Sequence, residues 1–296
     1  MPFAHPSLSR SAVTAQLRAA GCVFAEDEAE LLFAAPFTPA ELATAVERRV
    51  VGFPLEHILG WAEFCGLRIA VEPGVFVPRR RTELLVREAA ALLRAKSAVS
   101  VTAAGATPAS SKGSRSAPFA GDRGSGEGSV VVDLCCGSGA VGRALAALVT
   151  GIELHASDVD PVAVRCAQRN VDPVGGSVYE GDLYSALPAR IRGNIDILAV
   201  NAPYVPTESI SSMPHEARAH EPTVSLDGGP DGVDIQRKVA AAARTWLRPG
   251  GHLLIETSRR QAKLTATAVA QGGLTPRIAR SDELDATVVV GLRPLL

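Results

Sequence analysis

The sequence predicts an α/β fold, in which a doubly wound, largely parallel sheet follows a small helical N-terminal domain. Three observations predict it. Short apolar segments alternate with amphipathic helical segments from residue 130 onward, apolar residues recur at three- and four-residue spacing over residues 7–50, and a glycine-rich turn follows the first short apolar segment. Such alternation is typical of parallel sheets that bind ligands at the carboxyl ends of their strands.

The α/β domain is expected to span residues 82–296, beginning with a helix from about Thr82 to Arg94. Its seven strands are expected at Val130–Leu134, Ile152–Ala156, Ser177–Glu180, Ile195–Val200, His252–Glu256, Thr275–Ala279 and Ala286–Leu292. Further helices are expected at Val141–Val149, Val162–Asn170, Ile235–Trp246 and Gln261–Gln271. Residues 97–129 are rich in Ala, Ser, Gly and Thr, and this composition predicts a low-complexity loop or linker without chemistry of its own.

Residues 1–63 are expected to form the helical N-terminal domain. Thr38 with Glu41 fits a capping box at the start of one of its helices. Residues 64–81 are expected to form a β-hairpin connector, because apolar positions alternate there and Pro73-Gly74 offers a turn.

Composition limits the class of protein. Apolar residues make up 47% of the chain, which is enough for a packed core. Lys and Arg number 30 against 31 acidic residues, so direct nucleic-acid binding through phosphate contacts is not expected. The five cysteines form no Cys-x-x-Cys pair and are odd in number, which indicates a reducing compartment. Without a signal-peptide pattern or a membrane-spanning apolar run, we expect a cytoplasmic protein that does not contact membranes.

A candidate cofactor site begins at the turn after the first predicted strand. Its residues are Asp133, Cys135, Cys136, Gly137, Ser138 and Gly139. Glycines there allow backbone to approach a ligand closely and to turn into a helix. With Gly142 they spell Gly-x-Gly-x-x-Gly, which fits an NAD-dependent oxidoreductase equally well.

Three strand-terminal carboxylates favour S-adenosylmethionine over a dinucleotide. Asp158 ends the second strand, where it could bind both ribose hydroxyls, and Asp133 lies where a ligand's amino group would approach. Asp182 follows the third strand and could accept from an adenine amino group, with Leu183 against the ring. Taken singly, each Asp could be a helix cap or turn residue. Cys135 and Cys136 are interpreted as small packing residues rather than as a redox or metal pair.

The acceptor site is expected at Asn201-Ala202-Pro203-Tyr204, directly after the buried fourth strand. An amide or aromatic amine nitrogen is a poor nucleophile because its lone pair is delocalised. The Asn201 side-chain oxygen and the next backbone carbonyl could both accept from such an NH₂ group and aim its lone pair at a sulfonium methyl. Pro203 restricts the backbone, and Tyr204 offers a ring face to a flat acceptor.

Over nearly its whole length the chain resembles the HemK/PrmC-type protein-(glutamine-N5) methyltransferases. Besides the acceptor tetrapeptide, the resemblance rests on Gly52–Gly60, Glu63–Leu67, Val77–Glu83, Asp133–Gly139, Gly181–Tyr184, His220-Glu221-Pro222 and Asp227–Gly232. It implies a class I S-adenosylmethionine-dependent methyltransferase with a Rossmann-like seven-stranded sheet. Such enzymes methylate the Gly-Gly-Gln glutamine of peptide chain release factors, or a ribosomal-protein glutamine in a sister group.

The resemblance also implies roles for individual residues. Cys135–Gly139, Asp158 and Asp182-Leu183, together with Asp133 and Asn201, would bind S-adenosylmethionine. Asn201, Ala202, Pro203 and Tyr204 would hold the glutamine side chain, and residues 1–63 would dock the protein substrate.

Three departures from the family pattern mark a divergent subgroup. The usual Asn-Pro-Pro-Tyr is Asn-Ala-Pro-Tyr here, Pro-Arg-Pro-Glu-Thr-Glu is Pro78-Arg-Arg-Arg-Thr-Glu83, and the 97–129 insertion is longer than usual.

Three other functions stay open at this point: N6-adenine methylation of DNA or RNA, NAD-dependent oxidation, and cofactor binding without catalysis. The six histidines lack metal-ligand spacing, so no metal is expected, and His215 and His220 are interpreted as surface or loop residues. The three cations Arg79–Arg81 are interpreted as solvated.

Overall fold

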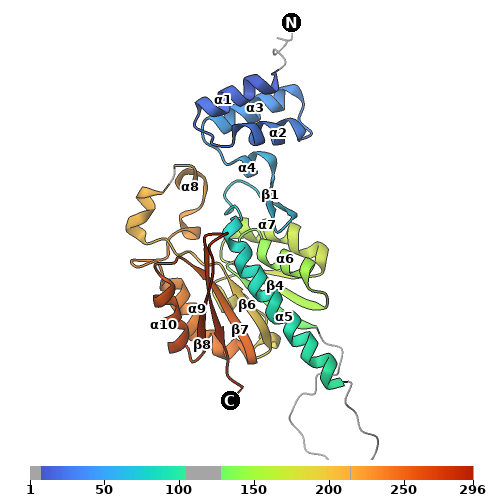
Figure 1. Cartoon of the computed structure of the whole chain (residues 1–296), viewed down its shortest axis with the longest axis vertical. Helices are drawn as coiled ribbons and strands as arrows, with labels where there is room; N and C mark the ends of the chain where they lie inside the picture. The colour runs from blue at the N-terminus through green and yellow to red at the C-terminus, as the bar shows by residue number, and fades with distance from the viewer. Residues whose placement is uncertain (1–7, 105–127, 214, 296) are drawn as a thin grey trace, which may run out of the picture.

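The computed structural model describes residues 8–104, 128–213 and 215–295. A helical N-terminal domain stands at one end of the molecule, and a larger α/β domain with a central sheet lies below it (Figure 1). Among the described residues, no helix has both the length and the apolar character needed to cross a membrane.

The central sheet has seven strands in the order β5-β4-β3-β6-β7-β9-β8. Strands β3 to β7 are parallel, whereas β9 runs antiparallel to both β7 and β8. Their bounds are β3 Ser129–Leu134, β4 Ile152–Asp158, β5 Ser177–Glu180, β6 Ile195–Val200, β7 Leu247–Thr257, β8 Thr275–Ser281 and β9 Ala286–Leu292. The predicted α/β class with a seven-stranded, mostly parallel sheet is confirmed.

Helices cover both faces of the sheet, because alternate strand residues point to opposite sides. Val131 of β3 belongs to one apolar cluster, while its neighbours Val130 and Val132 belong to the other. One face is covered by α5 Glu83–Ala104, α6 Ala140–Leu148 and α7 Pro161–Val171, and the other by α9 Asp234–Trp246 and α10 Ala262–Gln271. Short helical turns lie at η1 Arg80–Thr82, η2 Asp172–Val174, η3 Leu183–Ala186, η4 Ala189–Ile191, η5 Thr207–Ser212, α8 His215–His220 and η6 Thr223–Ser225.

The N-terminal domain has an apolar core of its own. It is built by α1 Arg10–Ala19, α2 Ala25–Ala34, α3 Pro39–Val50 and α4 Leu55–Leu59, with Val13, Leu17 and Leu32 fully buried. The predicted capping box is confirmed: the Glu41 backbone N–H donates to Thr38 Oγ1 at 3.3 Å, and the Thr38 N–H donates to the Glu41 carboxylate at 2.7 Å.

The predicted hairpin was placed too late in the chain. Antiparallel strands β1 Trp61–Phe64 and β2 Leu67–Ala70 pair across a turn at Cys65-Gly66, not at Pro73-Gly74. Both turn residues have positive φ, 51° and 72°, which is the conformation that a tight two-residue hairpin requires. The alternating pattern continues past β2 because the following segment packs against the cluster of Ala62, Val71 and Val77 without a strand partner.

Helix α5 is longer than predicted. It continues through the first eight residues of the expected 97–129 loop and ends at Ala104. Residues 97–104 contain neither Gly nor Pro, and alanine favours helix, so loop-like composition alone was a poor guide. The rest of the predicted loop, residues 105–127, lies outside the described residues, and β3 begins at Ser129.

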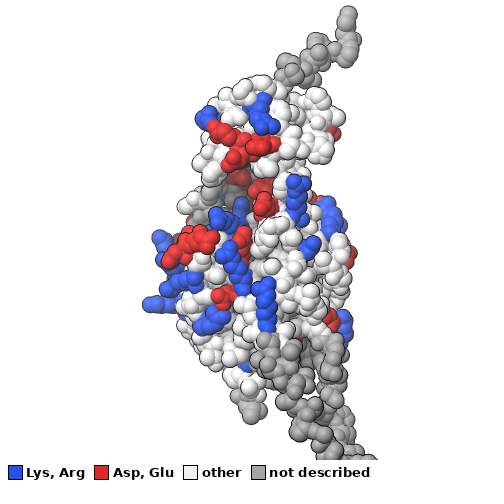
Figure 2. Space-filling model, turned by 45° about the vertical axis from the view of Figure 1, so that its right-hand side comes forward, with Lys and Arg blue, Asp and Glu red and all other residues white. Residues whose placement is uncertain are grey.

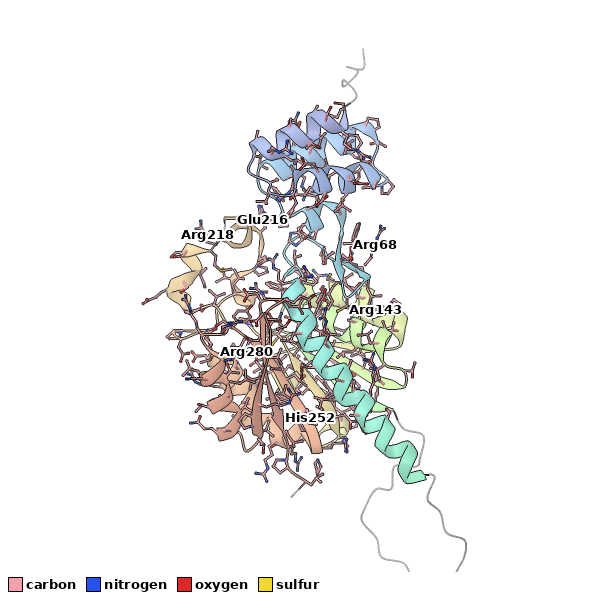
Figure 3. All side chains as sticks on the ribbon, in the orientation of Figure 1. Arg68, Arg143, Glu216, Arg218, His252 and Arg280 are labelled. Atoms are coloured by element: carbon pink, nitrogen blue, oxygen red, sulfur yellow. The ribbon has the colours of Figure 1, made fainter. Side chains whose placement is uncertain are left out.

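Two contacts join the N-terminal domain to the α8 segment of the α/β domain. Arg49, which also forms a double hydrogen bond with Glu28, donates to the Glu216 carboxylate at 3.1 Å. The Phe53 and His220 rings lie 4.2 Å apart. In Figure 3 the segment that carries Glu216 and Arg218 lies beside the N-terminal domain. His220 is therefore half-buried against Phe53 rather than free on the surface.

Candidate active site

A cavity of about 660 Å³ opens at the carboxyl ends of β3, β4, β5 and β6. This is where a doubly wound sheet binds its ligands. Every predicted site residue except Gly139 lines it: Asp133, Cys135, Cys136, Gly137, Ser138, Asp158, Asp182, Leu183, Asn201, Ala202, Pro203 and Tyr204. Much of the remaining wall comes from the connector before α5 and from the segment around η6.

The glycine turn between β3 and α6 is held in a left-handed conformation. Cys135, Gly137 and Gly139 have φ of 59°, 55° and 74°. Gly139 stands behind the cavity, where an added Cβ would lie 2.8 Å from a Val171 methyl, so it serves helix packing rather than ligand contact. The Gly137 backbone faces the cavity, and its N–H donates to the Asp158 carboxylate at 2.8 Å.

Asp133 is a buried carboxylate beneath this turn, 1% exposed. Its Oδ2 accepts from the Gly142 N–H at 2.8 Å. Burial raises its pKa to about 7, although the Gly142 N–H opposes the shift by stabilising the ionised form. A cationic group in the cavity would favour the ionised carboxylate, so the position suits an ammonium ligand.

Asp158 ends β4 and lies half-buried on the cavity wall. Burial raises its pKa, while the Asp160 and Gly137 N–H groups oppose the rise. The neighbouring Ser157 hydroxyl is buried, lines the cavity and has no hydrogen-bond partner within the described chain. A buried hydroxyl without a partner is costly. Together these groups offer acceptors and a donor to a polar ligand such as a ribose.

Asp182 follows β5 on the same edge and is exposed. Leu183 next to it has a φ of 47°, a strained value for a residue with a side chain. This turn holds Leu183 between the cavity and the apolar cluster on the face of the sheet that α9 and α10 cover. An acceptor beside an apolar face suits the amino edge and the ring of a flat base.

The Asn201–Tyr204 segment, called the acceptor loop after its predicted role, leaves β6, whose six residues are all buried. Ala202 is buried, and Asn201 and Tyr204 are partly exposed on the cavity wall. Val205 then pairs with the Asp227 segment: its N–H donates to the Leu226 carbonyl at 3.0 Å, and its own carbonyl accepts from Gly228 at 2.9 Å. The loop is therefore tied to the Asp227–Gly232 motif.

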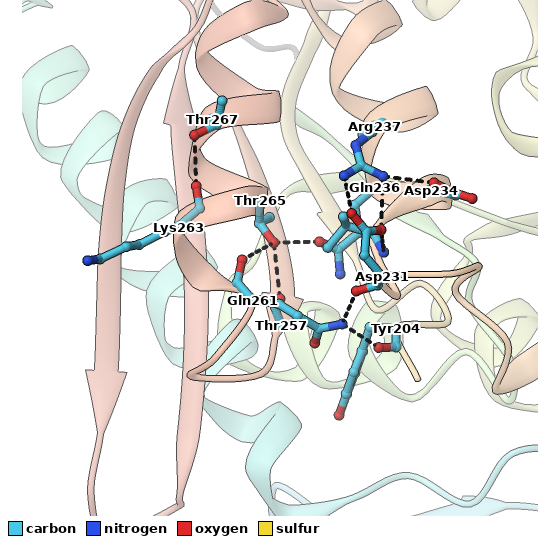
Figure 4. Close-up of polar contacts among 11 residues, drawn as sticks. Tyr204, Asp231, Asp234, Gln236, Arg237, Thr257, Gln261, Lys263, Thr265 and Thr267 are labelled. Atoms are coloured by element: carbon cyan, nitrogen blue, oxygen red, sulfur yellow. Dashed lines mark hydrogen bonds and ion pairs between the residues drawn. The ribbon is translucent and has the colours of Figure 1, made fainter. Parts of the chain in front are cut away.

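Gln261 holds the acceptor loop and the Asp227–Gly232 segment together. Its Nε2 donates to the Tyr204 carbonyl at 2.8 Å and to the Asp231 carbonyl at 2.9 Å, as Figure 4 shows. Gly232 must be glycine here because an added Cβ would lie 2.3 Å from the Tyr204 oxygen. These bonds fix the backbone of the acceptor loop.

Two of the three cations in Arg79–Arg81 lie against buried carboxylates, contrary to the sequence-based interpretation, and Arg80 is exposed as expected. Arg79 lines the cavity and forms an ion pair with the buried Glu221. Arg81 lies 3.8 Å from the buried Glu256, and Arg80 lies 3.6 Å from Glu283. The carboxylates that attract Arg79 and Arg81 are buried, and a sequence pattern does not reveal them, whereas Arg80 and Glu283 are both exposed.

Five polar residues near the cavity were missed by the sequence-based assignment of roles. They are Thr82, Ser157, Glu221, Glu256 and Gln261. Glu221 lies within the His220-Glu221-Pro222 motif, which could have marked it, whereas Glu256 and Gln261 occur in an ordinary strand end and helix cap.

The cysteines around the turn are not activated. All five cysteines are free thiols, and burial raises the pKa values of Cys135 and Cys136. Within the described ranges, no three His, Cys, Asp or Glu side chains form a group that could hold a metal ion.

Comparison with known proteins identifies related methyltransferases. Residues 123–217 match the family model of the methyltransferase small domain. The release factor glutamine methyltransferase of Geobacter sulfurreducens is 33% identical over 266 residues, which cover 88% of this chain and 81% of that protein. The 4-amino-L-phenylalanine/4-methylamino-L-phenylalanine methyltransferase of Streptomyces pristinaespiralis is 32% identical over 82% of this chain and 74% of its own. The solved protein-(glutamine-N5) methyltransferase of Alicyclobacillus acidocaldarius is 19% identical, with a TM-score of 0.40, over 76% of this chain and 98% of its own.

Proposed function

We propose a specific reaction from one premise: this chain belongs to the release factor glutamine methyltransferase family. The reaction is transfer of a methyl group from S-adenosylmethionine to the side-chain amide nitrogen of a protein glutamine. The observation that carries the proposal is the cavity that the strand-end carboxylates share with the Asn201–Tyr204 loop. An NAD-dependent oxidoreductase would have no use for that loop.

The cavity residues fit S-adenosylmethionine, which supplies an electrophilic sulfonium methyl when bound. Asp133, whose ionised form a cation would stabilise, suits the amino group of the methionine part. Asp158 and the unpartnered Ser157 hydroxyl suit the ribose. Asp182 and Leu183 suit the adenine amino group and ring. We assign cofactor binding to these residues and to the Cys135–Ser138 turn.

Asn201 and Ala202 would hold the acceptor amide. The Asn201 Oδ1 atom and the Ala202 carbonyl would each accept one N–H of the glutamine side chain, which orients the nitrogen toward the methyl donor. Because the amide lone pair is delocalised, placement in line with the transferred group contributes most of the rate. Pro203 restricts the loop, and the Tyr204 ring offers a flat contact on the cavity wall.

The protein partner is proposed to be a peptide chain release factor, and a ribosomal protein is the alternative partner. The N-terminal helical domain would dock it, supported by the Arg49–Glu216 and Phe53–His220 contacts that hold this domain beside the α8 segment. The proposed partners act in translation and all five cysteines are free, so we infer a cytoplasmic location.

A small aromatic amine is a second candidate acceptor. It is favoured by the 32% identity to the methyltransferase named for 4-amino-L-phenylalanine, since an aromatic amine is also a flat, weakly nucleophilic nitrogen. Adenine in DNA or RNA is less well supported, because the chain carries 30 basic against 31 acidic residues. On the face in Figure 2, acidic side chains gather on the N-terminal domain, and basic side chains predominate below it with some acidic ones between them.

The test is methylation of purified acceptors with labelled S-adenosylmethionine, followed by mass spectrometry of the products. We expect a methylated glutamine in the release factor and no product from the Asn201→Ala variant. Label on lysine would contradict the glutamine assignment. If 4-amino-L-phenylalanine is methylated and the release factor carries no label, the second candidate is established instead.

A further inference from the structure

The Glu256 carboxylate is buried at the end of β7, close to both side chains that would hold the acceptor. It is 2% exposed and lies next to the carboxyl end of β6 in the sheet. The Tyr204 hydroxyl donates to its Oε1 at 3.3 Å, and the Arg81 Nε lies 3.8 Å from the same oxygen. Its Oε2 has no partner within the described residues. A buried carboxylate is costly unless it is paired and hydrogen-bonded.

Thr82 connects this carboxylate to Asn201. Thr82 is 3% exposed, and its hydroxyl receives the Asn201 Nδ2 at 3.4 Å. Burial raises the pKa of Glu256, and the hydroxyls of Thr82 and Tyr204, together with Arg81, oppose that rise by favouring the ionised carboxylate. In the ionised form that these neighbours favour, the Glu256 carboxylate can only accept, and a hydroxyl has one proton. Thr82 must therefore donate to Glu256 and accept from the Asn201 NH₂ group.

This order of donors sets the orientation of the Asn201 amide. With Nδ2 directed at Thr82, Oδ1 is left as the free acceptor, and within the described chain no donor reaches it. If the Asn201 amide were reversed, its Oδ1 would face the Thr82 oxygen with no proton between them. Thr82 could supply that proton only by giving up its hydrogen bond to Glu256. The same carboxylate anchors the tip of the Tyr204 ring.

We propose that Glu256 and Thr82 are positioning residues for methyl transfer: through one hydrogen-bond chain they present the Asn201 carbonyl oxygen, and Glu256 also holds the Tyr204 ring through its hydroxyl. This inference rests on the proposed function of Asn201 as the residue that holds the acceptor. Glu256 lies outside the lining of the cavity, and Thr82 would act through Asn201 rather than on the transferred methyl group. Their effect is on the geometry of the acceptor nitrogen.

The test compares two substitutions of similar size at residue 82 and one at a matched site. Thr82→Val removes the hydroxyl, Thr82→Ser keeps it, and Thr257→Val removes a buried hydroxyl that pairs with Thr265 instead. We expect Thr82→Val to lower kcat on a purified release factor by about 10- to 100-fold, since small misplacements of a reacting group have effects of that size. Thr82→Ser and Thr257→Val should stay close to the wild-type kcat, and all three should bind S-adenosylhomocysteine normally.

Equal losses in Thr82→Val and Thr82→Ser would show a packing role and overturn the proposal, as would a wild-type kcat in Thr82→Val. If Thr82→Val does not fold, Glu256→Gln provides a second test, because it keeps the volume of the side chain. The NH₂ group that this substitution introduces can donate to Thr82. The Thr82 hydroxyl is then free to donate to Asn201 instead of accepting from it. We expect a lower kcat that is not reduced further by adding Thr82→Val, and a wild-type kcat in Glu256→Gln would also overturn the proposal.

A second measurement separates this inference from the proposed function. Hydrogen exchange of the Asn201 side-chain amide, followed by NMR and assigned with an Asn201→Asp variant, reports the Thr82 contact without any substrate. We expect faster exchange in Thr82→Val and protection in Thr82→Ser. If the wild-type enzyme labels no release factor, the proposed function fails, while unchanged Asn201 exchange in Thr82→Val would refute the positioning chain itself.

Discussion

Replacing Asp133 by Asn should stabilise the free protein and weaken its cofactor site at the same time. The carboxyl is 1% exposed, and burial raises its pKa from 3.8 to about 7. A raised carboxyl pKa means that the folded state prefers the protonated form. The contribution to stability is fully present below pH 3.8 and is lost as the pH rises toward 7.

The size of this effect follows from the shift. At about 1.4 kcal/mol for each pH unit, the folded protein loses up to about 4 kcal/mol between those two pKa values. The amide introduced by Asp133→Asn would not ionise, and its oxygen can still accept from the Gly142 N–H. We therefore expect Asp133→Asn to gain stability over the wild type at pH 8 and to differ little from it at pH 4.

Two measurements check this reasoning. Urea unfolding at several pH values gives the stability difference, and calorimetry with S-adenosylhomocysteine gives the binding constant. The wild-type affinity should rise with pH up to about 7, because the amino group of the ligand favours an ionised Asp133. The variant should bind weakly with a flat pH profile. A parallel pH dependence of stability in the two proteins would refute the assigned state of Asp133.

Further substitutions test the rest of the site. Asn201→Ala should abolish methyl transfer and leave S-adenosylhomocysteine affinity unchanged by calorimetry, so unchanged turnover would refute its assigned role. Gln261→Leu leaves two loop carbonyls without donors and should cost about 2–4 kcal/mol in urea unfolding, together with a fall in kcat. Gly139→Ala places a methyl 2.8 Å from Val171 at a positive φ and should cost about 1–3 kcal/mol in the same assay. Arg49→Ala should raise KM for the protein acceptor without changing cofactor affinity, whereas the exposed Arg18→Ala should change neither.

Elements with a single dominant pattern could be predicted closely from the sequence. The expected bounds of β5, β6 and β9 agree with the structure, since each is a short apolar or alternating run between clear breaks. The β1–β2 hairpin was misplaced because Cys65, a residue with a side chain, occupies a left-handed position that favours glycine. The end of α5 was misplaced because small residues in 97–104 fit helix and loop equally well.

The candidate site was predictable where chemistry and chain order coincide. Asp133, Asp158 and Asp182 each follow a strand, and parallel strands end at one edge, so their meeting in one cavity follows from topology. The supporting residues carry no such signal. Glu256 also ends a strand at this edge, but only the tertiary contacts with Tyr204 and Arg81 distinguish it from an ordinary strand residue.

The position of Glu256 also bears on Ala202, where the family pattern has proline. A proline at that position restricts the backbone after Asn201, and Ala202 does not. In this chain Gln261 holds the Tyr204 carbonyl, and the Val205–Asp227 bridge pairs the next residue. Thr82 and Glu256 hold the side chains of Asn201 and Tyr204. The loop is thus constrained at residues on both sides of Ala202, and rigidity that the first proline of the family pattern would supply locally is provided by the surrounding hydrogen bonds.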